Sequence, residues 1–408
     1  MLKNFVLVSF FILCSFNVNA QYYSTLPKGV RMLFSRYIKS DVSSSYNQGQ
    51  SETPYAYEIE TDIRTLEKIE DDTVQEILDL FKDYPEAYEK ISLGTHKMEA
   101  NASVEVNVFA FGYGITDRVM AYVGVPIYDA RVNLKYTKEK NSSQKEVAET
   151  LQNMYGDNWA QTLGNVVEKV YGIDGGTIQS GVTNALGYEE LGDWQAKGLG
   201  DIELGLMYNF VNKDDYGFLA TFGAVAPTGY VDDPDILQDM GFGDGQWDAF
   251  VELGGGYIID KNLVFNSWTR YTYQFESEKE LRVPYNQDIS ISDQKANFYQ
   301  KLGNKTDIGL SADIYLSDWF KFIPTFLYSH TDATKYYSAD DTANQILGQN
   351  TESYSQSLKL QGQLSSVRLF AQNKFVAPGL INFAYQTMLE GKNTPKVDLI
   401  EVEFRMYF

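Results

Sequence analysis

The stretch Val397–Phe408, VDLIEVEFRMYF, alternates residue by residue between two chemical characters. From residue 400 onward its even positions are apolar: Ile400, Val402, Phe404, Met406 and Phe408. The odd positions carry charge at their centre: Leu399, Glu401, Glu403, Arg405 and Tyr407. Because side chains of a β-strand point alternately to opposite faces, this period of two predicts a strand with one apolar face and one charged face.

Stretches of the same kind recur along the chain, and long and short links alternate between them. The expected strands are residues 29–39, 98–111, 118–136, 199–210, 216–226, 247–259, 263–276, 306–316, 319–331, 354–369, 379–390 and 397–408. The short links, such as Asp260–Asn262 and Ser317–Asp318, would all lie at one end of the sheet. Short periplasmic turns and long extracellular loops are typical of transmembrane barrels, which have an even number of strands. The sequence therefore predicts an all-β, antiparallel transmembrane β-barrel of about 12 strands.

Residues 1–20 have the three parts of a signal peptide. Lys3 supplies the positive charge, Phe5–Phe16 is a short apolar run, and Val18–Ala20 fits a cleavage site. The single cysteine, Cys14, lies within this segment and follows a leucine, which argues against lipidation. The remaining chain, residues 21–408, is therefore expected to be exported, to lack disulfides and to form one barrel domain.

The composition suits a membrane barrel and excludes a nucleic-acid-binding protein. A formal net charge of −21 leaves no basic face for nucleic acid. After residue 21 no stretch is long and apolar enough for a transmembrane helix. The 30 Tyr, 24 Phe and 32 Gly are the residues that aromatic girdles and tight turns use. We therefore expect the protein in the outer membrane of a Gram-negative bacterium, with the lipids of that membrane as partners.

The interior of this barrel is expected to be rich in charge. Alternation places residues such as Leu204, Phe265 and Leu310 outward and the intervening polar residues inward. The residues expected to line the lumen are Glu105, Asp201, Glu203, Asp248, Phe250, Glu252, Trp268, Arg270, Asp307, Asp313, Lys321, Glu401, Glu403 and Arg405. Two interpretations stay open: a network of salt bridges that stiffens the barrel, or a conducting path that favours cations. The aromatic members, Phe250 and Trp268, either bind an aromatic ligand or only fill space.

The third expected strand changes phase along its length. Between residues 119 and 125 its apolar residues occupy odd positions, whereas between residues 130 and 134 they occupy even positions. The change falls near Pro126, which cannot donate a hydrogen bond to a neighbouring strand. A bulge shifts the side-chain phase by one residue, so we predict a bulge or kink at Pro126.

Three of the long loops contain helical patterns. Residues 74–81 repeat apolar residues at a helical spacing, and Asp83–Pro85 ends the pattern. Residues 159–172 have the same spacing and end at a glycine. In the segment 233–241, Asp233 suits a helix cap and a proline follows at the first helical position. We expect these helices to pack on one another above the barrel or to form an apolar site at its mouth.

Four short motifs resemble those of a known family. They are Tyr113–Arg118 (YGITDR), Gly198–Ile202 (GLGDI), Pro227–Gly229 (PTG) and Gly241–Asp248 (GFGDGQWD). The chain resembles, in this order of motifs, the outer-membrane proteins linked to meta-cleavage phenol degradation, and more distantly the long-chain fatty-acid and aromatic-hydrocarbon outer-membrane transporters. The resemblance covers most of the mature chain and implies passive uptake of a small hydrophobic or aromatic ligand. The terminal Phe408 also resembles the signal that such barrels present to the barrel assembly machinery.

The sequence departs from the fatty-acid transporters before its first strand. Those proteins carry an N-terminal plug with an Asn-Pro-Ala motif, whereas here only residues 21–28 precede the first strand and the motif does not occur. A hatch in this barrel is therefore expected to be another segment, such as a loop folded inward.

Other functions rest on single features of the sequence. His330 stands beside Ser329 and Asp332, but neighbours on a strand point to opposite faces, so no catalytic triad and no enzyme is expected. The acidic run Asp232–Asp235 suits calcium or a helix cap equally well, and neither a metal nor a cofactor is assigned. A narrow or closed barrel with a structural or surface-interaction role, and a general porin that favours cations, remain alternatives to hydrophobic uptake.

Overall fold

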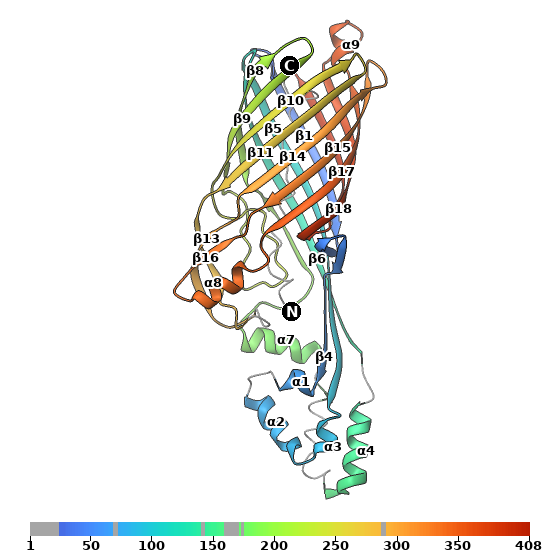
Figure 1. The fold of residues 1–408 in the computed structure, drawn as a ribbon, viewed down its shortest axis with the longest axis vertical. Coiled ribbons are helices and arrows are strands. Elements are labelled where there is room, and N and C mark those ends of the chain that lie inside the picture. The colour runs from blue at the N-terminus through green and yellow to red at the C-terminus, as the bar shows by residue number, and fades with distance from the viewer. Residues whose placement is uncertain (1–23, 68–71, 140–142, 159–170, 173–174, 287–290) are drawn as a thin grey trace.

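The structure, a computed structural model, is a β-barrel prolonged at one end by strands and helices (Figure 1). It describes residues 24–67, 72–139, 143–158, 171–172, 175–286 and 291–408. The expected signal peptide, and residues 159–170 of one expected helix, lie outside these ranges. Within the described ranges, no helix combines the length and the apolar composition that crossing a membrane requires.

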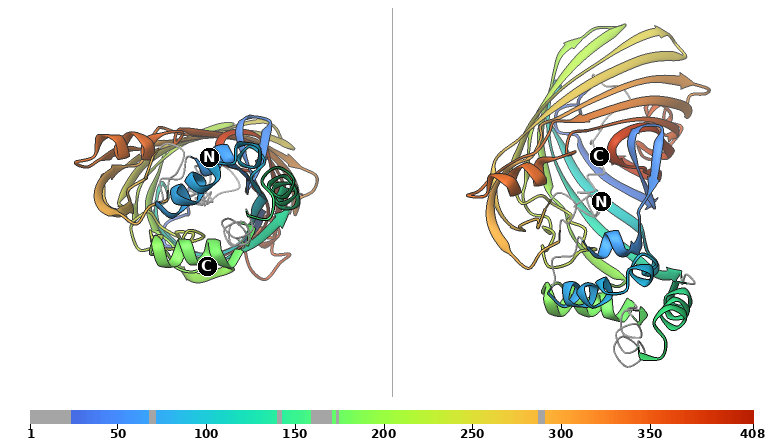
Figure 2. Two further views of the ribbon diagram at one scale, coloured as in Figure 1. Left: turned by 90° about the horizontal axis from the view of Figure 1, so that it is seen from below. Right: turned by 60° about the horizontal axis from the view of Figure 1, so that its bottom comes forward.

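The barrel is a closed ring of twelve antiparallel strands, as the sequence predicted (Figure 2, left). In chain order they are β1 (Arg31–Val42), β5 (Ser92–Thr116), β6 (Val119–Glu139), β8 (Ile202–Asn212), β9 (Tyr216–Ala226), β10 (Asp248–Asp260), β11 (Leu263–Gln274), β14 (Lys305–Tyr315), β15 (Phe320–Thr331), β17 (Ser353–Ser365), β18 (Gly379–Pro395) and β19 (Asp398–Tyr407). The pairings of β1 with β19 and of β17 with β18 close the ring. The predicted tenth strand is too long, because the short helix α9 (Val367–Ala371) follows β17 at the periplasmic turn.

The two faces of the closing strand β19 are as the alternation predicts. Val402 and Phe404 are exposed on the outside, whereas Glu403 and Arg405 are 1% and 3% exposed on the inside. The same alternation holds in β8, β11 and β14, where large apolar side chains remain exposed on the outer face. A closed barrel with an apolar outer belt is the arrangement that a lipid bilayer stabilises.

Strands β5 and β6 continue beyond the barrel and carry a helical head at the outer end (Figure 1). The head contains β4 (Ala56–Asp62), α1 (Ile63–Leu66), α2 (Asp72–Lys82), α3 (Pro85–Tyr88) and α4 (Ser143–Tyr155). Helix α2 confirms the helix predicted at residues 74–81, and its Leu78 and Phe81 pack against Leu151 of α4 in one apolar cluster. The sequence did not predict α4.

Further segments cover the outer end of the barrel. They are β2 (Ser44–Gly49), β3 (Ser51–Pro54), α7 (Gly175–Ser180), the π-helical turn η2 (Gly181–Ala185), β7 (Trp194–Leu199), and a separate sheet of β12 (Ser277–Arg282), β13 (Lys295–Lys301) and β16 (Lys335–Tyr337) with helix α8 (Asp341–Gly348). Phe298 of β13 is the fully buried centre of this separate sheet, and Leu281 and Ala343 pack with it.

The prediction of a helix at residues 233–241 is wrong. The segment makes two successive turns, in which Ile236 N–H donates to Asp233 O and Asp239 N–H donates to Ile236 O. Asp233 does cap, but it caps a turn by accepting from Asp235 N–H at 2.9 Å. Met240, which lies just beyond these turns, is buried in the apolar cluster of the barrel interior.

Candidate functional site: a two-sided barrel interior

Most of the residues expected in the lumen lie on the buried, inward face of the barrel. Those that are at most 8% exposed are Glu203, Asp248, Phe250, Glu252, Trp268, Arg270, Asp307, Asp313, Lys321, Glu401, Glu403 and Arg405. Asp201 is half-buried in the link between β7 and β8. The structure thus brings together charged side chains from many strands that the sequence places far apart.

Glu105 does not face the interior, contrary to expectation. Its neighbours Val104 and Val106 are fully buried on the inward face, and the Glu105 carboxylate lies 3.5 Å from Lys39 Nζ on the outer face. Farther along β5, Phe109 and Phe111 are the outward residues exposed to lipid. The outer face of β5 therefore changes from apolar to polar as the strand leaves the membrane, and the sequence alone did not show where that boundary lies.

The bulge or kink predicted in β6 at Pro126 is also wrong. Register with β5 is unbroken through Pro126, and Tyr122 and Ala130 lie on the same buried face. The change of phase in the sequence of β6 has another cause: its outward residues are apolar within the membrane and polar beyond it, as at Asp129 and Arg131.

The irregularity lies in the neighbouring strands. β6 pairs with β8 over residues 119–124 and with β7 over residues 127–132, and Gly200 and Asp201 cross between them. Pro126 accepts from Gly200 N–H at 2.9 Å but has no N–H to continue the ladder on that side.

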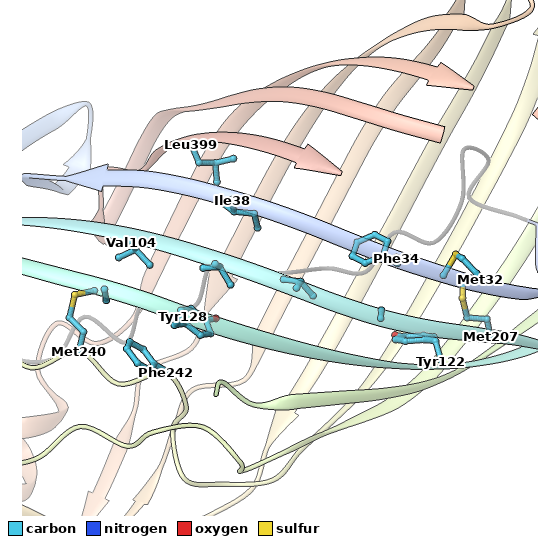
Figure 3. Packing of buried hydrophobic residues seen from close by; sticks show 14 of the residues in the cluster. Met32, Phe34, Ile38, Val104, Tyr122, Tyr128, Met207, Met240, Phe242 and Leu399 are labelled. Atoms are coloured by element: carbon cyan, nitrogen blue, oxygen red, sulfur yellow. The ribbon is translucent and has the colours of Figure 1, made fainter. Parts of the chain in front are cut away.

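One wall of the interior is mostly apolar, although Arg36 and Ser40 interrupt it on β1. It is formed by β1, β5 and β6, and Figure 3 shows its side chains in a row along these strands. The buried members from these strands are Met32, Phe34, Ile38, Val104, Val106, Val108, Ala110, Met120, Tyr122, Tyr128, Ala130 and Val132. Leu26, which precedes the first strand, packs against the periplasmic end of this wall.

The opposite wall is polar and is centred on Arg270 of β11. Its guanidinium is 2.6 Å from Glu203 of β8, and Tyr122 O–H donates to the same carboxylate at 2.6 Å. Phe250 of β10 lies beneath the guanidinium, 3.5 Å from ring centroid to Cζ. This cation–π contact and the ion pair hold the arginine against the barrel wall.

A second charged network joins β1 to β17, β18 and β19. Glu403 accepts from Arg36 at 2.6 Å, from Arg405 at 2.6 Å and from Asn382 at 2.7 Å. Glu401 pairs with Lys359 at 2.8 Å. Cations and carboxylates alternate in this network, so its buried charges compensate each other.

A loop folded inward covers the outer end of the apolar wall. This inward loop, residues 227–247, places Phe242 against Tyr128 with ring centroids 5.1 Å apart and planes 6° from parallel (Figure 3). Trp194 and Tyr230 also lie against Phe242. The loop therefore forms an aromatic cover at the mouth of the barrel, and it is a loop folded inward, the kind of segment expected to serve as a hatch.

Three of the glycine-rich motifs meet at Asp201. Its carboxylate accepts from Gly229 N–H at 2.8 Å and from Asp244 N–H at 3.3 Å. A Cβ on Gly200 would lie 2.4 Å from the Tyr128 ring, so only glycine fits there. Motifs far apart in the sequence thus form one junction between the inward loop and the break in pairing beside β6.

Ion pairs anchor the inward loop to the separate sheet of β12, β13 and β16, which we call the outer sheet. Asp232 is 2.5 Å from Lys279, and Asp235 is 2.5 Å from Arg282 and 2.8 Å from Lys295. Burial raises the pKa of Asp235, but the hydrogen bonds from Lys295 and Arg282 outweigh it and leave the pKa below its usual value. The two ion pairs of Asp235 therefore stabilise the loop above the ordinary titration range of aspartate and are lost only as the pH falls through the lowered pKa of Asp235.

Replacing Arg282 by alanine is expected to loosen the inward loop. The guanidinium also donates to Leu186 O and Gly187 O, at 2.8 Å each, so one side chain ties three outer segments together. Because the variant loses these charge-assisted hydrogen bonds, we expect proteinase K to cleave the loop roughly tenfold faster or more than in wild type. Arg131→Ala is the control, because Arg131 is exposed and its partner Asp129 lies 3.7 Å away. Equal cleavage of the two variants would contradict the anchoring role.

The acidic run Asp232–Asp235 and His330, for which other functions were considered, form ion pairs or hydrogen bonds with protein residues. Asp232 and Asp235 are used by the ion pairs above. His330 Nε2 lies 3.3 Å from Asp332, whereas Ser329 O–H donates to Asp307 at 2.6 Å. These three neighbours thus do not form a triad.

No known protein family and no curated protein matches the sequence. Among solved structures, the chain is similar to an outer membrane channel from Pseudomonas putida F1, with a TM-score of 0.54 and 12% identity over 95% of this chain and 98% of that one. The fold is that of an outer-membrane channel.

Lower scores relate the chain to two toluene transporters. TbuX of Ralstonia pickettii has a TM-score of 0.36 and 11% identity over 94% of this chain and 90% of that one. TodX of Pseudomonas putida has a TM-score of 0.31 and 10% identity over 94% and 89%. At the level of fold, the resemblance to outer-membrane channels drawn from the glycine-rich motifs is confirmed. The fold and the apolar outer belt place the protein in a Gram-negative outer membrane.

Proposed function

We propose that the protein is an outer-membrane channel for passive uptake of small hydrophobic or aromatic compounds. The observation that carries the proposal is the apolar wall of β1, β5 and β6 inside the barrel. A transmembrane barrel ordinarily places polar residues inward. Because the lipid lies outside the barrel, apolar residues on the inner wall do not serve membrane contact. Along β5 and β6 they give an apolar solute a continuous surface.

The apolar wall has aromatic side chains at the outer mouth and methionine side chains at the periplasmic end. At the outer mouth, Phe242 stacks on Tyr128 and Trp194 lies beside it, which gives an aromatic compound a surface of similar chemistry. At the periplasmic end, Met32 and Met120 provide adaptable apolar contacts.

One alternative is a closed barrel with a structural or surface-interaction role. The compensated network of Arg36, Glu403 and Arg405 favours it, since paired buried charges stiffen a barrel without conducting. Uptake measurements separate the two functions.

Uptake of radiolabelled naphthalene into proteoliposomes tests the proposal. We expect Val104→Asn with Val106→Asn to lower the rate roughly threefold or more, because two amides interrupt the apolar surface that the solute follows. Glu105→Asn is the matched control: it lies between these residues and faces outward, so uptake should not change. Equal rates in wild type, double variant and protein-free liposomes would leave the closed barrel as the better function.

A further inference from the structure

The polar wall contains more acidic than basic side chains around Arg270. In the sheet, Glu252 of β10 and Asp307 of β14 lie directly opposite Arg270 on its two sides. With Glu203, three carboxylates surround one guanidinium, and all four side chains are at most 8% exposed. A surplus of buried negative charge is costly unless a cation or a bound proton compensates it.

Oxygen atoms without partners point to the same place. In the part of the chain that the structure describes, Asp307 Oδ2 has no hydrogen-bond donor, although Asp307 is 3% exposed. Thr221, 2% exposed and directly opposite Glu252, likewise has an unpartnered hydroxyl. Carboxylate and hydroxyl oxygens are the groups that replace the hydration shell of a small cation.

This acceptor-rich surface continues along the barrel in both directions. Toward the outer mouth, Asp248 and Gln274 lie opposite each other on β10 and β11. Toward the periplasm, Asn266 and Ser311 lie opposite each other on β11 and β14. Among the described residues, Gln274 Oε1, Asn266 Oδ1 and Ser311 Oγ also lack hydrogen-bond partners. The unpaired oxygens therefore form a series along one wall.

The arrangement suits a passing cation better than a resident one. Within the described ranges, no group of three or more acidic, histidine or cysteine residues is placed to chelate a metal ion. The network around Glu403 has no comparable surplus of carboxylates, since Arg36, Arg405 and Lys359 surround Glu401 and Glu403. Among the described residues of the barrel interior, carboxylates therefore outnumber cations around Arg270 but not around Glu403.

We propose that this polar wall conducts small monovalent cations, and that Glu203, Glu252 and Asp307 select cations over anions as they pass Arg270. The route meets the apolar wall, on which the proposed uptake function depends, at Tyr122, whose O–H donates to Glu203. One barrel then has two parallel surfaces, one for apolar solutes and one for alkali metal ions.

Bilayer recordings of the full-length mature protein in a KCl gradient test the inference. We expect wild type to favour K⁺ over Cl⁻ by roughly tenfold or more, because the carboxylates of Glu203, Glu252 and Asp307 outnumber the nearby cations Arg270 and Lys305 in a low-dielectric interior. Glu252→Gln with Asp307→Asn keeps shape and removes the charge, so the ratio should fall to near unity. The control Glu105→Gln removes an outward carboxylate and should keep the wild-type ratio. Glu252→Asp with Asp307→Glu restores the charges and should recover selectivity.

Several outcomes overturn the inference. They are a silent wild-type barrel, a wild type without cation preference, and a neutral double variant that is as selective as wild type. Before recording, the change in SDS-gel mobility between unheated and heated samples verifies that each variant is folded. Naphthalene uptake is measured in the same preparations: uptake with no cation selectivity refutes only the ion route, whereas selectivity without uptake refutes only the proposed hydrophobic channel.

Discussion

Glu403→Gln is expected to lower the free energy of unfolding by about 3–5 kcal/mol, because it leaves buried arginines without their counter-ion. Glu403 is 1% exposed and accepts from both Arg36 and Arg405 at 2.6 Å. Neither guanidinium can lose its proton to escape the desolvated site. Glu401, 3.5 Å from Arg36, compensates only part of the charge, since Lys359 already occupies it. Urea unfolding of the purified barrel in detergent, followed by tryptophan fluorescence, measures the change.

Two controls separate this effect from a general loss of charge. Glu149→Gln removes a carboxylate whose partner Lys145 is 81% exposed, so unfolding should change by less than about 0.5 kcal/mol. Replacing Arg36, Glu403 and Arg405 together by apolar residues of similar volume should restore most of the lost stability. If Glu403→Gln unfolds at the wild-type urea concentration, the network does not stabilise the barrel.

Strand number and link order followed from local chemistry. In a transmembrane barrel one face of each strand meets lipid and the other meets the interior, so apolar and polar residues alternate. Its short turns all lie at the periplasmic end. The closing strand β19 needed only that rule. The bounds 216–226 predicted for β9 also match the structure, although its sequence is apolar on both faces.

The inner and outer faces of β5 and β6 could not be predicted, because alternation shows that two faces differ but not which one is inside. In most strands the apolar face is outward. In β5 above the membrane it is inward, so Val104 and Val106 line the interior while Glu105 faces water. The signal was present as the change of phase near Pro126, but a bulge explained it equally well.

Long-range contacts were equally inaccessible. Asp201 meets Gly229 and Asp244 only because the inward loop returns to the barrel wall. The outer sheet of β12, β13 and β16 pairs segments on either side of two barrel strands, and loop composition gives no register for such pairing. The carboxylates around Arg270 were each expected inside, but their proximity follows from strand order and register.

Gly309→Val is expected to destabilise the barrel by roughly 2–4 kcal/mol, because it fills the space on which a tryptophan ring lies. A Cβ at Gly309 of β14 would lie 2.2 Å from Nε1 and 2.4 Å from Cε2 of Trp268, directly opposite on β11. The ring would have to swing into the interior, beside the wall proposed to carry cations. Urea unfolding should show the loss, and K⁺ conductance should fall with it.

The nearest atoms to that Cβ all belong to the Trp268 side chain, so the clash has a clean rescue. Trp268→Ala removes the ring, and the double variant Gly309→Val with Trp268→Ala should be more stable than the sum of the two single changes predicts. Additive losses would mean that the glycine acts through its backbone. Rescue would indicate a wider role for such pairs, because Gly205 lies equally close to Tyr122 and Gly223 to Phe250. In each pair a glycine lets an aromatic ring lie flat on the next strand, which keeps the bulk of the ring out of a narrow interior.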